Sequence, residues 1–244
     1  MIRIGSILVG LFFTLVLAIS FVSGAITTAQ EGLPHTVESQ FVKHPKHLAL
    51  SSDGAFGQFD RQQLQRGFQV YQEVCAACHS LRHVAYRDLE QLGYNEAEVK
   101  AIAGKATINA ADPMSGELKD RPGLPSDRFP KVVYAGKGAP PDLSLIAKAR
   151  HGGPAYVYSL LTGYADAATY KNEEGKALPK QNRPGDGLFF NPYFANLNLS
   201  MPAPLTSEGQ VTYSDGTKAT VDQMSQDVSA FLLWTAEPKL DKRR

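Results

Sequence analysis

The sequence of 244 residues contains only two cysteines and almost no excess of charge. Two cysteines cannot form a disulfide scaffold, and a zinc site would need two further ligands at suitable spacing. Lysine and arginine total 25 and aspartate and glutamate total 24, which leaves a net charge of +1. This balance gives no indication of a surface for nucleic acid or another polyanion, so no nucleic-acid partner is expected.

Glycine and proline are concentrated between residues 104 and 204, which makes that region rich in loops. A small hairpin is expected at residues 211–216. Helical patterns cover residues 60–75, 82–103 with a break at Gly93, 143–150, 154–162 and 220–237. Gly67, inside the first pattern, either lets another helix approach closely or is a tolerated defect. The patterns predict a mostly helical domain with few short strands, whose long loops need a large apolar cofactor to pack on.

The first 29 residues differ from the rest of the chain. Residues 4–26 carry no charge and are mostly apolar, a length that can cross a bilayer as a helix. Arg3 before this run, and small residues around Gly24 and at Ala29, are also typical of a secretory signal with its cleavage site. We therefore expect residues 1–29 to be a signal peptide or a membrane anchor, and the remainder to be exported. The absence of an Arg- and Ser-rich transit peptide favours a bacterial protein.

Both cysteines belong to one short motif, Cys75-Ala76-Ala77-Cys78-His79. This is C-x-x-C-H, the attachment signal of c-type heme. Two intervening residues let one helical turn present both thiols along one heme edge, where each adds to a vinyl group. The histidine then lies under the iron as the proximal ligand. A redox pair would be expected beside a βαβ pattern, which is lacking, so the motif predicts one covalently attached heme c.

The second axial ligand has to come from a methionine or a histidine. His83 is too close to His79 to reach the opposite heme face, and Met224 has the position of a core residue on its helix. Met201 lies in a loop that prolines stiffen, and a stiff loop can hold a thioether at the iron with little entropic cost. Elimination therefore favours Met201, although it could simply fill a hydrophobic gap. The histidines of the arm that precedes the first helix also stay open: His35, His44 and His47.

A histidine and a methionine together would occupy both axial positions of the iron. Oxygen and peroxide then find no open position, so the remaining chemistry is the gain and loss of one electron. The soft thioether favours Fe(II) and raises the reduction potential. The ligand pair predicts an electron carrier, whereas a relative of the diheme peroxidases would need a second C-x-x-C-H motif.

Further short motifs lie on both sides of the heme motif. They are Phe68-Gln69-Val70-Tyr71, Val84-Ala85-Tyr86-Arg87, Arg121-Pro122-Gly123, Pro140-Pro141-Asp142-Leu143-Ser144, Ala149-Arg150-His151-Gly152-Gly153, Ser159-Leu160-Leu161-Thr162-Gly163-Tyr164, Asn191-Pro192-Tyr193-Phe194 and Trp234-Thr235-Ala236-Glu237-Pro238. From about residue 35 to residue 244 the chain thereby resembles cytochrome c1, the heme subunit of the cytochrome bc1 complex. The resemblance is to the alphaproteobacterial form.

The resemblance implies a c-type cytochrome fold with long loop insertions over residues 30–244. It implies Met201 as the sixth ligand, and it places Arg150 and Tyr156 near a heme propionate. The family takes electrons from the Rieske iron–sulfur protein, passes them to a soluble or tethered cytochrome c, and works beside cytochrome b. The oxidoreductase activity belongs to that complex, and the chain itself is an electron carrier. The heme domain is then expected on the periplasmic side of the bacterial inner membrane.

Two features of the family are not evident in this sequence. Its C-terminal membrane helix should follow shortly after residues 239–244, so we expect the chain to be truncated. Its acidic docking patch has one candidate cluster, which basic residues flank as on an ordinary solvated face: Asp88, Glu90, Glu96 and Glu98. The alternative function is another membrane-tethered c-type cytochrome of a different respiratory complex, which gives no reason for the shared motifs.

Overall fold

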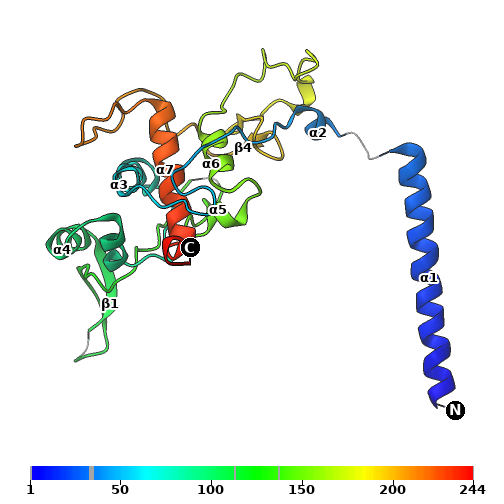
Figure 1. Ribbon diagram of the computed structural model, residues 1–244, viewed down its shortest axis with the longest axis horizontal. Helices are drawn as coiled ribbons and strands as arrows, with labels where there is room; N and C mark the ends of the chain where they lie inside the picture. The colour runs from blue at the N-terminus through cyan, green and yellow to red at the C-terminus, as the bar shows by residue number, and fades with distance from the viewer. Residues whose placement is uncertain (1, 33–35, 113, 137, 244) are drawn as a thin grey trace. The chain divides into compact units, whose positions relative to one another are not determined.

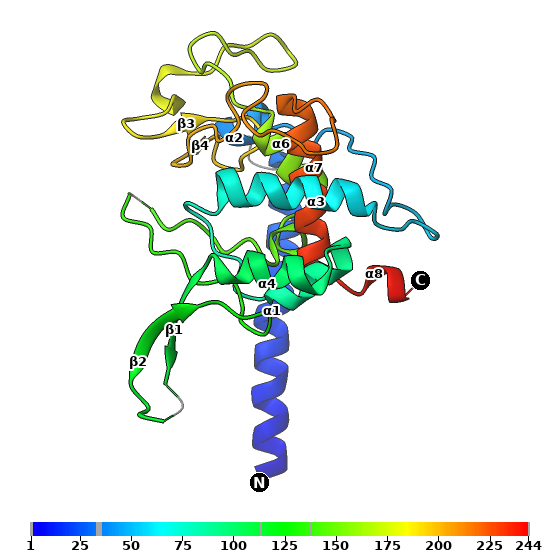
Figure 2. The same cartoon turned by 90° about the vertical axis from the view of Figure 1, so that its left-hand side faces the viewer.

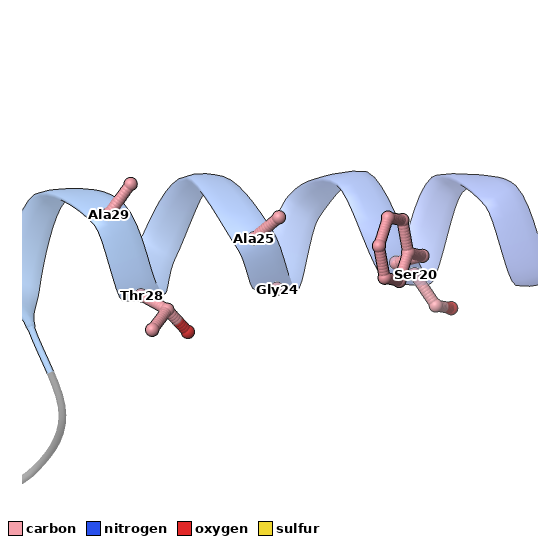
Figure 3. Close-up of a pocket in the computed structure, with 6 residues that line it drawn as sticks. Ser20, Gly24, Ala25, Thr28 and Ala29 are labelled. Atoms are coloured by element: carbon pink, nitrogen blue, oxygen red, sulfur yellow. The ribbon is translucent and has the colours of Figure 1, made fainter.

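The computed structural model describes residues 2–32, 36–112, 114–136 and 138–243 (Figure 1). The chain forms two compact units, Met1–Gln40 and Phe41–Arg244. In the first unit, helix α1 (Ile2–Glu31) is long and apolar enough from Arg3 to Glu31 to cross a membrane, a test that a secretory signal also passes. An open hollow along this helix is lined by six residues: Ser20, Phe21, Gly24, Ala25, Thr28 and Ala29 (Figure 3).

Two crossing helices, α3 (Arg61–Val70) and α7 (Val221–Ala236), form the centre of the second unit (Figure 2). Asp60 caps α3, because its carboxylate accepts hydrogen bonds from the first free backbone N–H groups of the helix. The hydroxyl of Thr220 caps α7 in the same way, by accepting from the backbone N–H of Gln223 at 3.0 Å. Both predicted helix starts are thereby confirmed.

Gly67 of α3 lies against the backbone of α7. A β-carbon at this position would lie 2.1 Å from the carbonyl oxygen of Asp227, so the helices can cross this closely only over glycine. Aromatic rings fill the core beside the crossing. The ring of Phe231 is stacked on that of Trp234 and tilted against that of Phe68, with 5.6 Å between the ring centroids in both pairs. Of the two interpretations of Gly67, close approach is the correct one.

The helical pattern over residues 82–103 divides into two elements of different kinds. The 3₁₀ helix η2 (Tyr86–Leu92) ends at Gly93, whose φ of 99° turns the chain, and helix α4 (Glu96–Gly104) follows behind an Asn95 cap. Residues 82–85 are not helical. The break at Gly93 is confirmed, and the helix type and start are corrected.

Two predictions about hairpins were wrong. Strand β1 (Thr107–Ala111) pairs antiparallel with β2 (Leu118–Pro122) in a region expected to be loop, and this hairpin projects from the second unit (Figure 2). Residues 211–216 form a turn with no strand pair. Most side chains of β1 and β2 are exposed, so the apolar alternation that marks a half-buried strand is missing.

The remaining elements are short and are separated by long loops. They are α2 (Val37–Phe41), the π-helical turn η1 (Tyr71–Cys75), α5 (Ile146–Ala149), α6 (Gly153–Leu161), η3 (Lys180–Asn182), β3 (Phe189–Phe190), β4 (Asn198–Leu199) and α8 (Leu240–Arg243). Helices α5 and α6 pack on α7. The fold is therefore mostly helical, with few short strands, long loops and an apolar N-terminal helix, as the sequence predicts.

Candidate heme site

The heme motif occupies one compact turn at the end of α3. The backbone N–H of Ala76 donates to the carbonyl of Tyr71 at 2.8 Å, five residues back, which makes η1 a π-helical turn. The N–H groups of Cys78 and His79 both donate to the carbonyl of Cys75, at 3.1 and 2.9 Å. π-Helical turns are frequent at functional sites. Here the π-helical turn ends at Cys75, and Cys78 and His79 follow within the next four residues.

Both cysteine side chains are half-buried, and they form no disulfide. Burial, with a smaller effect of the nearby Cys78, raises the pKa of Cys75 to about 12. The side chain of Cys75 packs against the apolar core together with Ala76. Cys75 therefore connects the heme motif to the hydrophobic core.

The imidazole of His79 is fixed by a hydrogen bond between its Nδ1 and the carbonyl oxygen of Pro141, 2.8 Å long. A carbonyl oxygen can only accept, so Nδ1 carries a proton, and Nε2 is the ring nitrogen left for a metal. Histidines that bind metals are oriented in this way by a partner on the other ring nitrogen. The residues of the motif therefore fit a heme iron bound through Nε2 of His79.

Several hydrogen bonds hold the loop of Pro141 against the chain that follows the motif. The backbone N–H of Leu143 donates to the carbonyl of Ser80 at 2.9 Å. The carboxylate of Asp142 accepts from the backbone N–H and the Nε of Arg82, at 3.0 and 3.2 Å. These contacts fix the distance between Pro141 and His79. The family resemblance places the Pro140-Pro141 turn near the heme, but the hydrogen bond to His79 was not predicted, because its acceptor is a backbone carbonyl 62 residues away.

Met201 lies just after the β3–β4 pair and is half-buried. The turn between these strands contains Leu197, which is buried and has a φ of 63° although it is not a glycine. Backbone strain of this kind persists only where the surroundings impose it. The side chain of Asn191 donates to the carbonyl of Leu160 at 2.8 Å and so ties the turn to α6. Met201 thus follows shortly after a constrained strand pair in the chain, and its role as the second ligand stays a prediction.

The other methionines and histidines of the described residues, apart from His79, differ from Met201 in burial. Met224 is fully buried in the core, and Met114 is 98% exposed. The exposed histidines are His44, His47, His83 and His151. His35 lies outside the described residues. Among the described residues, no group of three or more His, Cys, Asp or Glu side chains gathers where it could hold a metal ion.

Arg150 and Tyr156 lie close to one another at the start of α6. Burial raises the pKa of Tyr156, and the nearby guanidinium of Arg150 opposes this effect. Arg150 is exposed and donates from Nη1 to the carbonyl of Ala149 at 3.0 Å. The structure thus brings together a cation and a hydroxyl, and their approach to a heme propionate stays a prediction.

A mostly helical domain with two thiols and an imidazole on one turn, the imidazole fixed through Nδ1, defines a c-type cytochrome. A sequence model of the Cytochrome C1 family matches residues 50–244. The chain belongs to the cytochrome c1 family. Membership of this family, together with Cys75, Cys78 and His79, shows that the chain carries a covalently bound heme c.

Curated relatives come from bacteria and from mitochondria. The chain is 46% identical over 204 residues to cytochrome c1 of Rhodospirillum rubrum, an alignment that covers 78% of this chain and 75% of that protein. It is 42% identical over 233 residues to the mitochondrial cytochrome c1 heme protein of Saccharomyces cerevisiae, covering 92% and 69%. It is 42% identical over 220 residues to cytochrome b/c1 of Bradyrhizobium diazoefficiens, covering 78% of this chain and 30% of that protein.

Proposed function

We propose that the chain is the heme-bearing subunit of a quinol–cytochrome c oxidoreductase. In this role it relays electrons one at a time from a Rieske iron–sulfur protein to a soluble or tethered cytochrome c. The observation that carries the proposal is the hydrogen bond from Nδ1 of His79 to the carbonyl of Pro141. It leaves Nε2 of His79 as the atom that would bind the iron, and Met201 would supply the second ligand.

Heme supplies the one-electron Fe(II)/Fe(III) couple when it is bound. His79 donates from Nδ1 to a backbone carbonyl, which orients the ring and raises the basicity of Nε2. Met201 offers a soft thioether that favours the reduced state. Arg150 and Tyr156 are proposed to bind the propionates through a guanidinium and a hydroxyl, groups suited to carboxylates.

The proposed partners are cytochrome b, the Rieske protein and the acceptor cytochrome c. The printed name of the Bradyrhizobium relative joins cytochrome b with cytochrome c1. This name supports cytochrome b as a neighbour. Helix α1 supports attachment to or passage across a membrane. We propose the bacterial inner membrane, with the heme domain of residues 30–244 on its periplasmic side.

Co-purification tests this function. The full chain, tagged and produced in a bacterium that attaches heme c, should be isolated from detergent-solubilised membranes with a cytochrome b and a Rieske protein. The preparation should reduce cytochrome c in a quinol-dependent way. A preparation that contains heme c but the subunits of another respiratory complex would contradict the proposal and would favour the alternative of a different membrane-tethered cytochrome.

A further inference from the structure

The hydroxyl of Tyr164 donates a hydrogen bond of 2.9 Å to the backbone carbonyl of Met201, 37 residues further along the chain. Tyr164 is half-buried, and burial raises its pKa, so the hydroxyl stays protonated and able to donate. Met201 lies outside any helix or strand. Its carbonyl is therefore held by a side chain from another segment and not by a helix or a sheet.

Tyr164 is itself fixed, because the chain around it packs tightly. Its neighbour Gly163 is buried, and a β-carbon there would lie 2.4 Å from Cδ2 of Tyr193. The backbone N–H of Gly163 donates to the carbonyl of Leu160 at the end of α6. Tyr164 thus belongs to a short segment that packs between the end of α6 and the β3–β4 turn. A hydrogen bond from such a support restrains the position of its acceptor.

The predicted ligand on the other side shows the same arrangement. The hydroxyl of Tyr71 donates to the backbone carbonyl of His79 at 3.0 Å, and Tyr71 is buried in the core. The carbonyl of each predicted axial ligand therefore accepts a hydrogen bond from a tyrosine that is packed elsewhere in the fold. Tyr71 is only eight residues from His79. Tyr164 is the more informative of the two, because it joins segments that are distant in sequence.

We propose that Tyr164 is a positioning residue for the sixth ligand: its hydroxyl holds the backbone of Met201 so that the thioether faces the heme iron. The inference rests on the proposed function, in which Met201 binds the iron. Without the hydroxyl, the loop gains conformations in which the thioether is displaced, and an external ligand competes better for the iron. Loss of one hydrogen bond to a carbonyl changes such an equilibrium by about fivefold.

The test is titration of the ferric full-length holoprotein with imidazole, which replaces a thioether ligand. Tyr164→Phe keeps the ring and removes only the hydroxyl. The Tyr164→Phe variant should bind imidazole about fivefold more tightly than the wild type, because the loss of one hydrogen bond weakens the competing thioether ligand by that factor. The near-infrared charge-transfer band of the iron–thioether bond should weaken at equal heme content. The matched control is Tyr170→Phe, because its hydroxyl donates to the carbonyl of Phe41 at 3.5 Å, away from Met201.

Equal imidazole affinity in Tyr164→Phe, Tyr170→Phe and the wild type would overturn the positioning role. An equal increase in both variants would overturn it as well, since it would show a general loosening of the fold. Met201→Leu separates this failure from failure of the proposed function. If Met201→Leu loses the charge-transfer band while Tyr164→Phe behaves as wild type, only the role of Tyr164 is refuted. If Met201→Leu keeps the band, the ligand assignment itself fails.

Discussion

Arg66 of α3 forms an ion pair with Asp227 of α7, with Nε 3.0 Å from a carboxylate oxygen that is fully buried. The pair lies next to Gly67, whose neighbour across the helix crossing is the backbone of the same aspartate. Gln223 donates a further hydrogen bond to this carboxylate at 2.9 Å. A buried charge has to be paired and hydrogen-bonded, and this arrangement fixes one relative position of the two helices. The turn η1 and the heme motif follow α3 directly in the chain, so the helix crossing also fixes where the motif begins.

Gly67→Ala should destabilise the protein strongly, because its methyl group would overlap the carbonyl oxygen of Asp227. Overpacking of this kind lowers the free energy of unfolding by about 1–3 kcal/mol. The upper end is expected here, because the methyl group meets backbone, which cannot move aside as a side chain can. Gly104→Ala is the control, since a β-carbon at the end of α4 meets nothing within 4 Å. The control should be neutral or stabilising by up to about 1 kcal/mol. Thermal unfolding of the two holoproteins measures the difference, and equal midpoints would refute the close contact.

Asp142 should make the site sensitive to acid. Burial raises the pKa of Asp142, but hydrogen bonds from Ser144 and Arg82 outweigh it and keep the pKa below its ordinary value of 3.8. The folded state therefore favours the carboxylate. Its stabilising contribution is complete above pH 3.8 and is lost as the pH falls through the lower pKa of the folded state. Protonation would loosen the loop that holds Pro141 against His79.

Asp142→Asn tests this dependence. At neutral pH the variant should unfold at a lower temperature than the wild type, because the charge and one acceptor oxygen are lost. The difference between the thermal unfolding midpoints of the variant and the wild type should decrease as the pH falls below 3.8. Asp186→Asn, on an exposed turn, serves as the control and should follow the wild type throughout. A gap that stays constant with pH would show that Asp142 does not act through its charge.

Lys46 ties the arm that follows α2 to helix α6. Its Nζ donates to the carbonyl and the hydroxyl of Thr162, at 3.1 and 2.7 Å, and lies 5.7 and 5.4 Å from the ring centres of Tyr158 and Tyr193. Lys46→Met should lower the free energy of unfolding by about 1–3 kcal/mol, since it removes two cation–π contacts and the hydrogen bonds of Nζ. Lys43→Met, with one ring contact at 5.7 Å, should cost less. Limited proteolysis within residues 42–50 should be faster in Lys46→Met, and equal rates in both variants would contradict the role.

Sequence alone predicts those residues of the site that lie close together along the chain. C-x-x-C-H needs only its own spacing, so Cys75, Cys78 and His79 could be assigned together. The partners of the two axial ligands could not be found this way. Pro141 and Tyr164 contribute a carbonyl and a hydroxyl from 62 and 37 residues away, and neither residue type at such a distance carries a signal.

The same distinction applies to the fold. Asp60 and Thr220 mark helix starts through a mechanism confined to one turn, and both were predictable. The π-helical form of η1 was not, because it differs from the α-helix by one residue in the hydrogen-bond pattern. The β1–β2 hairpin was missed since its pairing leaves most side chains in solvent, which removes the alternation from the sequence.

The near-infrared spectrum and reduction potential of Met201→Leu, measured beside Met224→Leu, test the assignment of the electron carrier most directly. Met224 is fully buried in α7 and serves as the matched methionine control. Loss of the charge-transfer band and a lower potential are expected in Met201→Leu alone, with covalent heme retained in both variants. A Met201→Leu protein that kept the band and the potential would show that another residue binds the iron opposite His79.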